Sequence, residues 1–264
     1  MPVVSRISIA PVKGLALVHP DEVTLEETGV VANRRFHIVD AEGRRYNQLR
    51  NGHLVRIKPE YDPESERLTL RFPDGTVADG TVEPGREITT DFYGRPVEGR
   101  IVVGPWSEAL SRWAGRPLRL VQSAPGQAVD RRRGDVSLIS TASLAELARH
   151  GGQSEVDGRR FRMLFELDDC EPHEEDSWVK RRLRIGEALV YMRNDVGRCA
   201  ITTQNPETGV PDFDTLRTLS AYRELTENEA GKKHIPLGVF GEVVEPGRVA
   251  LGDTAEAVEP SLLA

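Results

Sequence analysis

Short apolar segments, separated by turn residues, dominate the first half of the chain. In residues 68–72, Leu68 and Leu70 alternate with polar side chains, and the turn sequence Asp74-Gly75 follows. This alternation is typical of a strand with one buried face. The predicted strands of this half lie at residues 3–9, 23–25, 36–38, 54–57 and 68–72. Strands this short and this closely spaced predict a barrel or a sandwich.

Helical patterns are few. Trp106, Leu110 and Trp113 fall four and three residues apart, which predicts a helix over residues 106–114. Ser143 and Glu146 form a capping-box pattern, so we expect a second helix to begin at Ser143. A third helix is predicted at residues 214–223, and further strands at residues 118–121, 135–140, 160–167, 189–192, 237–244 and 248–251. The expected fold class is mainly β with a few helices.

The length of 264 residues suits one large domain or two domains of ordinary size. The polar residues 127–134 interrupt the succession of strands, and we expect them to form a linker or a loop. We therefore expect a first domain at residues 1–125, a second domain at residues 126–256 and a frayed tail at residues 257–264.

Composition narrows the classes of function. The net charge of −7 argues against a nucleic-acid binder, because such proteins depend on many Lys and Arg contacts with phosphates. No apolar run approaches the roughly 20 residues of a membrane-spanning helix, and the first residues form no apolar leader. We expect a cytoplasmic protein without a membrane partner. The chain has only two cysteines, Cys170 and Cys199, which excludes a four-cysteine iron–sulfur cluster and disfavours structural zinc.

Cys199 is the residue most suggestive of chemistry. It follows Arg198 and precedes Thr202, between an apolar segment at residues 189–192 and a turn at residues 205–209. A neighbouring guanidinium lowers the pKa of a thiol, which suits a nucleophile or a metal ligand. Free cysteine is also among the most buried residue types, so Cys199 could equally be a small apolar residue on a strand. The local sequence leaves both interpretations open.

Several short motifs occur in an order that points to a known family. In the second half they are Arg160-Phe161-Arg162, Asp176-Ser177-Trp178, Arg198-Cys199-x-x-Thr202-Thr203-x-Asn205-Pro206-x-Thr208-Gly209 and Gly247-x-x-x-x-Gly252-Asp253. This half resembles a MOSC domain, the molybdenum-cofactor sulfurase C-terminal module. Through Pro11-Val12-Lys13-Gly14 and residues 29–36, the first half resembles the barrel module that precedes MOSC in the amidoxime-reducing-component and YcbX-like group. The resemblance implies an N-terminal β-barrel module followed by a MOSC β-barrel domain.

The resemblance also implies a site for the molybdenum cofactor, molybdopterin with bound molybdenum. Cys199 matches the single cysteine of the family's Arg-Cys motif and would be the catalytic protein ligand of molybdenum. Soft metals favour cysteine sulfur, whereas the phosphate of the cofactor favours guanidinium groups and backbone amides. The residues implied to bind the cofactor are Lys13, Arg34, Asp135, Ser143, Arg162, Arg198 and Thr202.

Two positions depart from the family pattern. The family's Asp-Arg pair is Asn33-Arg34 here, which removes a carboxylate that would orient Arg34. The asparagine two residues after the Arg-Phe-Arg motif is Leu164, which removes a polar contact near the cofactor. Without the resemblance, Arg34 would be read as a surface residue and Ser143 as a plain helix cap.

The implied activity is the reduction of small N-hydroxylated compounds, or of N-oxides and S-oxides, by oxygen-atom transfer at a molybdenum bound by Cys199. YcbX-like relatives carry a fused ferredoxin-type domain, for which this chain lacks the cysteines, so electrons would come from a separate flavin or iron–sulfur protein. A second interpretation is a carrier of the cofactor, or a sulfur-transfer module with a persulfide on Cys199, without reductase turnover. A third is a cysteine hydrolase, although no catalytic-cysteine signature surrounds Cys199.

Overall fold

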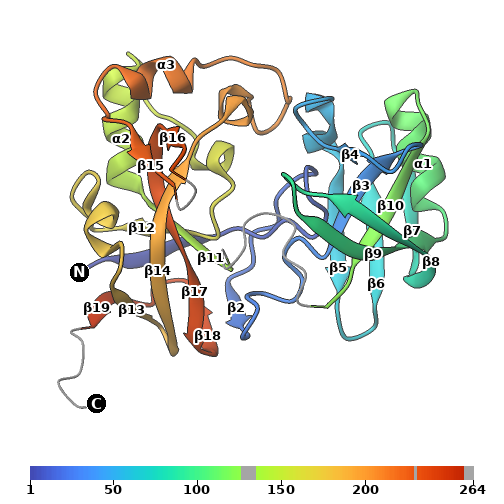
Figure 1. The fold of residues 1–264 in the computed structure, drawn as a ribbon, viewed down its shortest axis with the longest axis horizontal. Coiled ribbons are helices and arrows are strands. Elements are labelled where there is room, and N and C mark those ends of the chain that lie inside the picture. Colours follow the sequence, from blue (N-terminus) through green and yellow to red (C-terminus); the bar gives the residue numbers. More distant parts are fainter. Residues whose placement is uncertain (126–134, 229–230, 259–264) are drawn as a thin grey trace.

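The computed structural model describes residues 1–125, 135–228 and 231–258. Nineteen strands and three short α-helices lie within these ranges, which confirms the expected mainly-β fold. The chain forms two lobes that lie side by side in Figure 1: most of the blue-to-green residues form one lobe, and the yellow-to-red residues form the other together with the dark-blue N-terminal segment. The predicted linker at residues 127–134 lies wholly outside the described ranges. The predicted tail at residues 257–264 is described only at residues 257–258, which belong to a strand and are not frayed.

The first lobe contains a five-stranded sheet with the order β4-β3-β10-β9-β8 and a three-stranded sheet with the order β5-β6-β7. Their strands are β3 (Phe36–Asp40), β4 (Arg45–Tyr46), β5 (Lys58–Asp62), β6 (Arg67–Arg71), β7 (Val77–Thr81), β8 (Glu83–Asp91), β9 (Pro96–Val103) and β10 (Leu118–Ser123). In β6 the alternation has the predicted effect, because Leu68 and Leu70 are buried in the core of the lobe. Helix α1 (Trp106–Ala114) packs on β10 and ends at Gly115 in a left-handed conformation.

The strand predicted at residues 54–57 is wrong, because this segment forms the 3-10 helix η1 (Gly52–Arg56). The side chain of Asn51 accepts a hydrogen bond from the backbone amide two residues on and so begins the turn. Leu54 and Ile57 are both fully buried. Their spacing of three residues places them on one face of a 3-10 helix, so the apolar pattern alone did not distinguish the two structures.

The second lobe contains a seven-stranded sheet with the order β1-β12-β11-β17-β14-β13-β19. Its strands are β1 (Val3–Ile7), β11 (Val136–Ser140), β12 (Phe165–Asp168), β13 (Arg182–Ile185), β14 (Ala188–Gly197), β17 (Pro236–Glu245) and β19 (Ala255–Val258). Two further pairs are β2 (Glu22–Leu25) with β18 (Gly247–Ala250), and β15 (Thr226–Glu227) with β16 (Lys233–His234). The first two strands of the chain therefore pair with strands of its second half.

Helices α2 (Thr141–His150) and α3 (Thr215–Ser220) and the 3-10 helix η3 (Glu174–Trp178) also belong to the second lobe. Helix α2 begins two residues earlier than predicted. Its N-cap is Ser140, whose hydroxyl accepts a hydrogen bond from the amide of Ser143. Ser143 thus lies in the first turn of the helix and is not its cap.

The strand predicted at residues 160–167 is wrong over its first half. This part forms the 3-10 helix η2 (Gly158–Phe161), and Arg162 follows with a left-handed backbone before β12 begins. The side chain of Asp157 caps η2 by accepting a hydrogen bond from a backbone amide. Arg160 and Arg162 therefore do not share the solvent face of a sheet. Among all described helices, none is both long enough and apolar enough to cross a bilayer.

Candidate functional site

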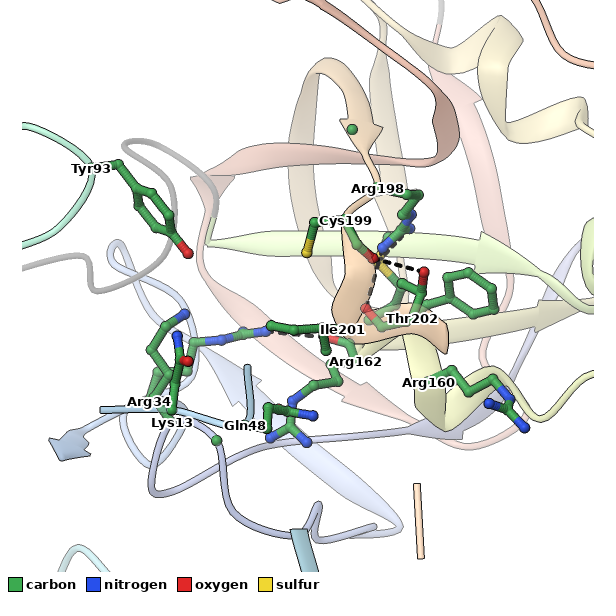
Figure 2. A pocket seen from close by; sticks show the side chains of 15 residues that line it. Lys13, Arg34, Gln48, Tyr93, Arg160, Arg162, Arg198, Cys199, Ile201 and Thr202 are labelled. Carbon is green, nitrogen blue, oxygen red and sulfur yellow. Dashed lines mark hydrogen bonds between the residues drawn. The ribbon is translucent and has the colours of Figure 1, made fainter. Parts of the chain in front are cut away.

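A cavity of about 330 Å³ lies where residues from both lobes meet. The first lobe contributes Lys13, Gly14, Arg34, Asn47, Gln48 and Tyr93. The second contributes Arg160, Phe161, Arg162, Met163, Gly197, Arg198, Cys199, Ile201 and Thr202. All of the predicted site residues except Asp135 and Ser143 line this cavity. Figure 2 shows their side chains around the open space.

Cys199 lies at the cavity just after the end of strand β14. The strand ends at Gly197, and Cys199 is the extended N-cap of the 3-10 helix η4 (Ala200–Thr203). The hydroxyl and the amide of Thr202 both donate to the carbonyl of Cys199, at 2.9 and 3.1 Å, and so close the turn. Cys199 is exposed, and Figure 2 shows its sulfur pointing into the open space. The interpretation of Cys199 as a buried apolar residue is therefore wrong.

The other cysteine has a different environment. Cys170 is a half-buried free thiol at the start of the acidic loop that leads into η3. Burial, followed by the charges of Glu174, Glu175 and Asp168, raises the pKa of the Cys170 thiol to about 12. Because the thiolate is the form that binds metals, Cys170 is poorly suited to that role.

Arg198 holds the backbone beside Cys199. Its Nε donates to the carbonyl of Leu237 on β17 at 2.8 Å, and its Nη1 donates to the carbonyl of Phe161 on η2 at 3.3 Å. The guanidinium also lies 5.0 Å from the centre of the Phe161 ring. These contacts tie the approach to Cys199 to two other elements of the lobe. A direct contact of Arg198 with a cofactor stays a prediction.

Three basic side chains, those of Lys13, Arg34 and Arg162, line the cavity from both lobes. Arg34 Nη2 donates to the carbonyl of Arg162 at 3.1 Å, and Arg162 Nη2 donates to the carbonyl of Leu15 at 2.8 Å. Both arginines have left-handed backbones, with φ of 55° and 53°. Such conformations persist only where the surrounding structure enforces them, and they are frequent at functional sites.

Asn33, which stands where the family has an aspartate, has a structural role. Its Oδ1 accepts a hydrogen bond from the amide of Ala10 at 2.9 Å, and the amide of Arg34 donates to the carbonyl of Ala10 at 2.7 Å. Asn33 therefore holds the loop that carries Arg34 against the segment that follows β1.

The structure places Ser143 outside the lining of the cavity. Its hydroxyl is buried, donates to Glu175 Oε2 at 2.9 Å and accepts from the amide of His173 at 2.8 Å. Glu175 also accepts from the hydroxyl of Ser140 at 2.8 Å, and burial raises the pKa of this carboxyl. These contacts join the start of α2 to η3.

Asp135 also lies outside the lining. It precedes β11, and its Cβ lies within 3.1 Å of the position that a Cβ on Gly29 would occupy. Burial, and secondly the charge of Glu242, raise the pKa of Asp135 to about 6. Neither Asp135 nor Ser143 is therefore among the residues that line the cavity.

Sequence reasoning missed several lining residues, namely Asn47, Gln48, Tyr93, Met163, Gly197 and Ile201. Tyr93 lies at the tip of the hairpin between β8 and β9, far along the chain from every motif. The turn-forming Gly94 beside it was the only local signal.

Contacts of backbone and side-chain atoms hold the two lobes together beside the cavity. A Cβ added to Gly209 would lie 2.0 Å from the carbonyl oxygen of Gly52, so the two glycine backbones are in close contact. His53 Nδ1 lies 3.1 Å from the carbonyl oxygen of Thr208. Gln204 Nε2 donates to the carbonyl of Gln48 at 2.9 Å. These contacts join residues 48–53 of the first lobe, which include the start of η1, to residues 204–209 after η4.

Two domain families match the chain: the MOSC N-terminal beta barrel domain matches residues 1–102, and the MOSC domain matches residues 127–256. Mitochondrial amidoxime-reducing component 1 of Homo sapiens is 27% identical over 95% of this chain and 81% of its own length. The protein of the same name from Danio rerio is 29% identical over 72% of this chain and 61% of its own length. Among solved structures, the YUAD protein from Bacillus subtilis is 12% identical, with a TM-score of 0.47 over 97% of this chain and 96% of that chain.

The two domain matches together span nearly the whole chain, which therefore belongs to the MOSC-domain proteins that carry an N-terminal MOSC β-barrel domain, and it is similar to the mitochondrial amidoxime-reducing components.

Proposed function

We propose that the chain binds the molybdenum cofactor in the cavity between its lobes and reduces N-hydroxylated compounds there. The observation that carries this proposal is the exposed thiol of Cys199 in a cavity that Lys13, Arg34 and Arg162 also line. A thiolate suits a soft metal, and guanidinium and ammonium groups suit a phosphate. The donor set therefore fits a ligand that carries one of each, and the names of the relatives agree with the proposed reaction.

Each residue would have one task in this site. Cys199 would bind the metal, while Lys13, Arg34 and Arg162 would hold the phosphate and the pterin. Arg198 would keep the backbone beside Cys199 in place through the carbonyls of β17 and η2. When bound, the cofactor supplies the two-electron chemistry that removes an oxygen atom from an N–O or S–O group. A separate flavin or iron–sulfur protein would supply the electrons.

Replacing Cys199 by Ser tests the proposal. The wild-type protein, purified from a host that makes the cofactor, is expected to contain molybdenum and pterin and to reduce an amidoxime with a chemical electron donor. Cys199→Ser is expected to lose this activity, because a hydroxyl is a poorer ligand for a soft metal than a thiolate. Cys170→Ser is the matched control and is expected to keep both the metal and the activity.

Three outcomes would contradict the proposal. If the purified wild-type protein contained neither molybdenum nor pterin, the chain would not bind the cofactor. Protein that holds the cofactor but reduces no N-hydroxylated compound, N-oxide or S-oxide would favour the carrier interpretation. A cyanide-labile sulfur that disappears in Cys199→Ser would favour the persulfide form of that interpretation.

A further inference from the structure

Tyr93 lines the same cavity as Cys199 but belongs to the other lobe. Figure 2 shows its hydroxyl end directed toward the open space that Cys199 faces. The residue is 66% exposed, which is high for a large aromatic side chain. The ring of Tyr93 is therefore accessible to a molecule that occupies the cavity.

Turn chemistry does not explain a tyrosine at this position. The backbones of Phe92 and Arg95 exchange hydrogen bonds of 2.7 and 3.3 Å around a two-residue turn, in which Tyr93 has φ of 60° and Gly94 has φ of 82°. Turns with two positive φ values favour Asn-Gly, Asp-Gly or Gly-Gly. Tyrosine is strained in this conformation, and strain of this kind gathers at functional sites.

The ring is also held in place. Phe92 is buried, and its ring meets that of His37 edge-on with the centres 5.1 Å apart, which anchors the tip of the hairpin. The guanidinium of Arg45 lies 4.0 Å from the centre of the Tyr93 ring. A ring that is ordered before a ligand arrives loses little conformational entropy on binding.

We propose that Tyr93 is a specificity-determining residue whose ring stacks on the planar aromatic part of an N-hydroxylated substrate. This inference rests on the proposed function, because it assumes that such a compound enters the cavity. The other aromatic residue among the lining side chains that the structure describes is Phe161, which is buried at 5% exposure, whereas Tyr93 is exposed. Tyr93 is thus the aromatic surface that the cavity offers to a ligand.

Benzamidoxime and acetamidoxime separate the effect of the ring from that of the reacting group, because only the first carries an aromatic ring. Binding of each is measured by calorimetry on cofactor-loaded protein without an electron donor. Tyr93→Asn is expected to weaken benzamidoxime binding about tenfold and to leave acetamidoxime binding unchanged. Tyr93→Phe keeps the ring and is expected to bind both compounds as the wild type does.

The unfolding temperature of Tyr93→Asn distinguishes a ligand contact from a structural role. Asparagine tolerates positive φ, so Tyr93→Asn is expected to unfold at the same or a higher temperature than the wild type. If the ring merely stabilised the hairpin, the midpoint would fall and both affinities would decline together. Glu66→Asn is the matched control, because Glu66 has φ of 49° in a turn that does not line the cavity. It is expected to change neither affinity.

The outcomes separate this inference from the proposed function. Unchanged benzamidoxime affinity in Tyr93→Asn, an equal loss for both compounds, or a wild type that binds neither compound would overturn the role of Tyr93. Turnover is measured separately, with a chemical electron donor added to the same loaded protein. A wild type that binds benzamidoxime through Tyr93 but does not reduce it would overturn the proposed function and support the stacking contact.

Discussion

At the scale of single residues, His37 shows how burial sets the charge state of an imidazole in the first lobe. Its Nδ1 lies 3.0 Å from the hydroxyl oxygen of Ser123, and its Nε2 lies 3.1 Å from that of Thr90. Burial, with a smaller contribution from the positive charge of Lys13, lowers the pKa of His37 to about 3. The imidazole therefore stays neutral in the folded protein at neutral pH.

This lowered pKa predicts a loss of stability in acid. An unfolded histidine binds a proton near pH 6.5, whereas folded His37 does so only near pH 3. Its stabilising contribution is complete above pH 6.5 and is lost as the pH falls toward 3. Urea unfolding from pH 7 to 4 is expected to show a steeper decline for the wild type than for His37→Gln, by up to about 1.4 kcal/mol per pH unit. Equal slopes would contradict this, and the exposed His53→Gln is the control.

Sequence motifs predicted those residues of the cavity lining that belong to short, recognisable patterns. Cys199, Lys13 and Arg162 all line the cavity, and each was recognisable because it lies in a motif whose spacing is local. Tyr93 could not be predicted in this way. Its place in the cavity depends on how the hairpin of one lobe meets the other lobe, and no local pattern encodes that arrangement.

At the scale of elements, capping side chains explain why 3-10 helices occur in two segments that were predicted to be strands. The apolar spacings at residues 54–57 and 160–167 fit strands, but Asn51 and Asp157 each cap a 3-10 helix there. Short apolar runs fit either structure, so the cap determines the result. Strands such as β6 were predictable because their alternation is regular and closed by a turn.

The start of α2 gives a prediction at this scale. Ser143→Ala removes a donor to the buried Glu175 and an acceptor for the amide of His173. We expect a loss of about 1–3 kcal/mol in the free energy of unfolding, measured in urea, with unchanged pterin content. The matched control Ser220→Ala removes an exposed helix hydroxyl and should cost less than about 0.5 kcal/mol. Loss of pterin from a stable Ser143→Ala protein would instead support the cofactor contact implied by the family resemblance.

At the scale of the whole molecule, the cavity exists because two lobes are held in one arrangement. Strand β1 pairs with β12 and β2 pairs with β18, so the start of the chain is built into the second lobe. The pattern of each strand predicted its existence but not its partner, because pairing over more than 150 residues leaves no local signal. The contacts of Gly52 with Gly209 join the lobes a second time, beside the cavity.

Because of this second junction, we predict that retention of the cofactor requires glycine, which has no side chain, at position 209. Gly209→Ala would place a Cβ 2.0 Å from the carbonyl oxygen of Gly52, so the lobes would have to move apart. Gly75→Ala is the matched control, because Gly75 has a similar φ, 86° against 74°, but nothing lies within 4 Å of its Cβ position. Both variants carry the same kind of backbone strain. Pterin fluorescence per chain is therefore expected to fall in Gly209→Ala but not in Gly75→Ala. Circular dichroism is expected to show folded strands in both variants. Equal pterin content in the two variants would show that the cavity does not depend on this contact.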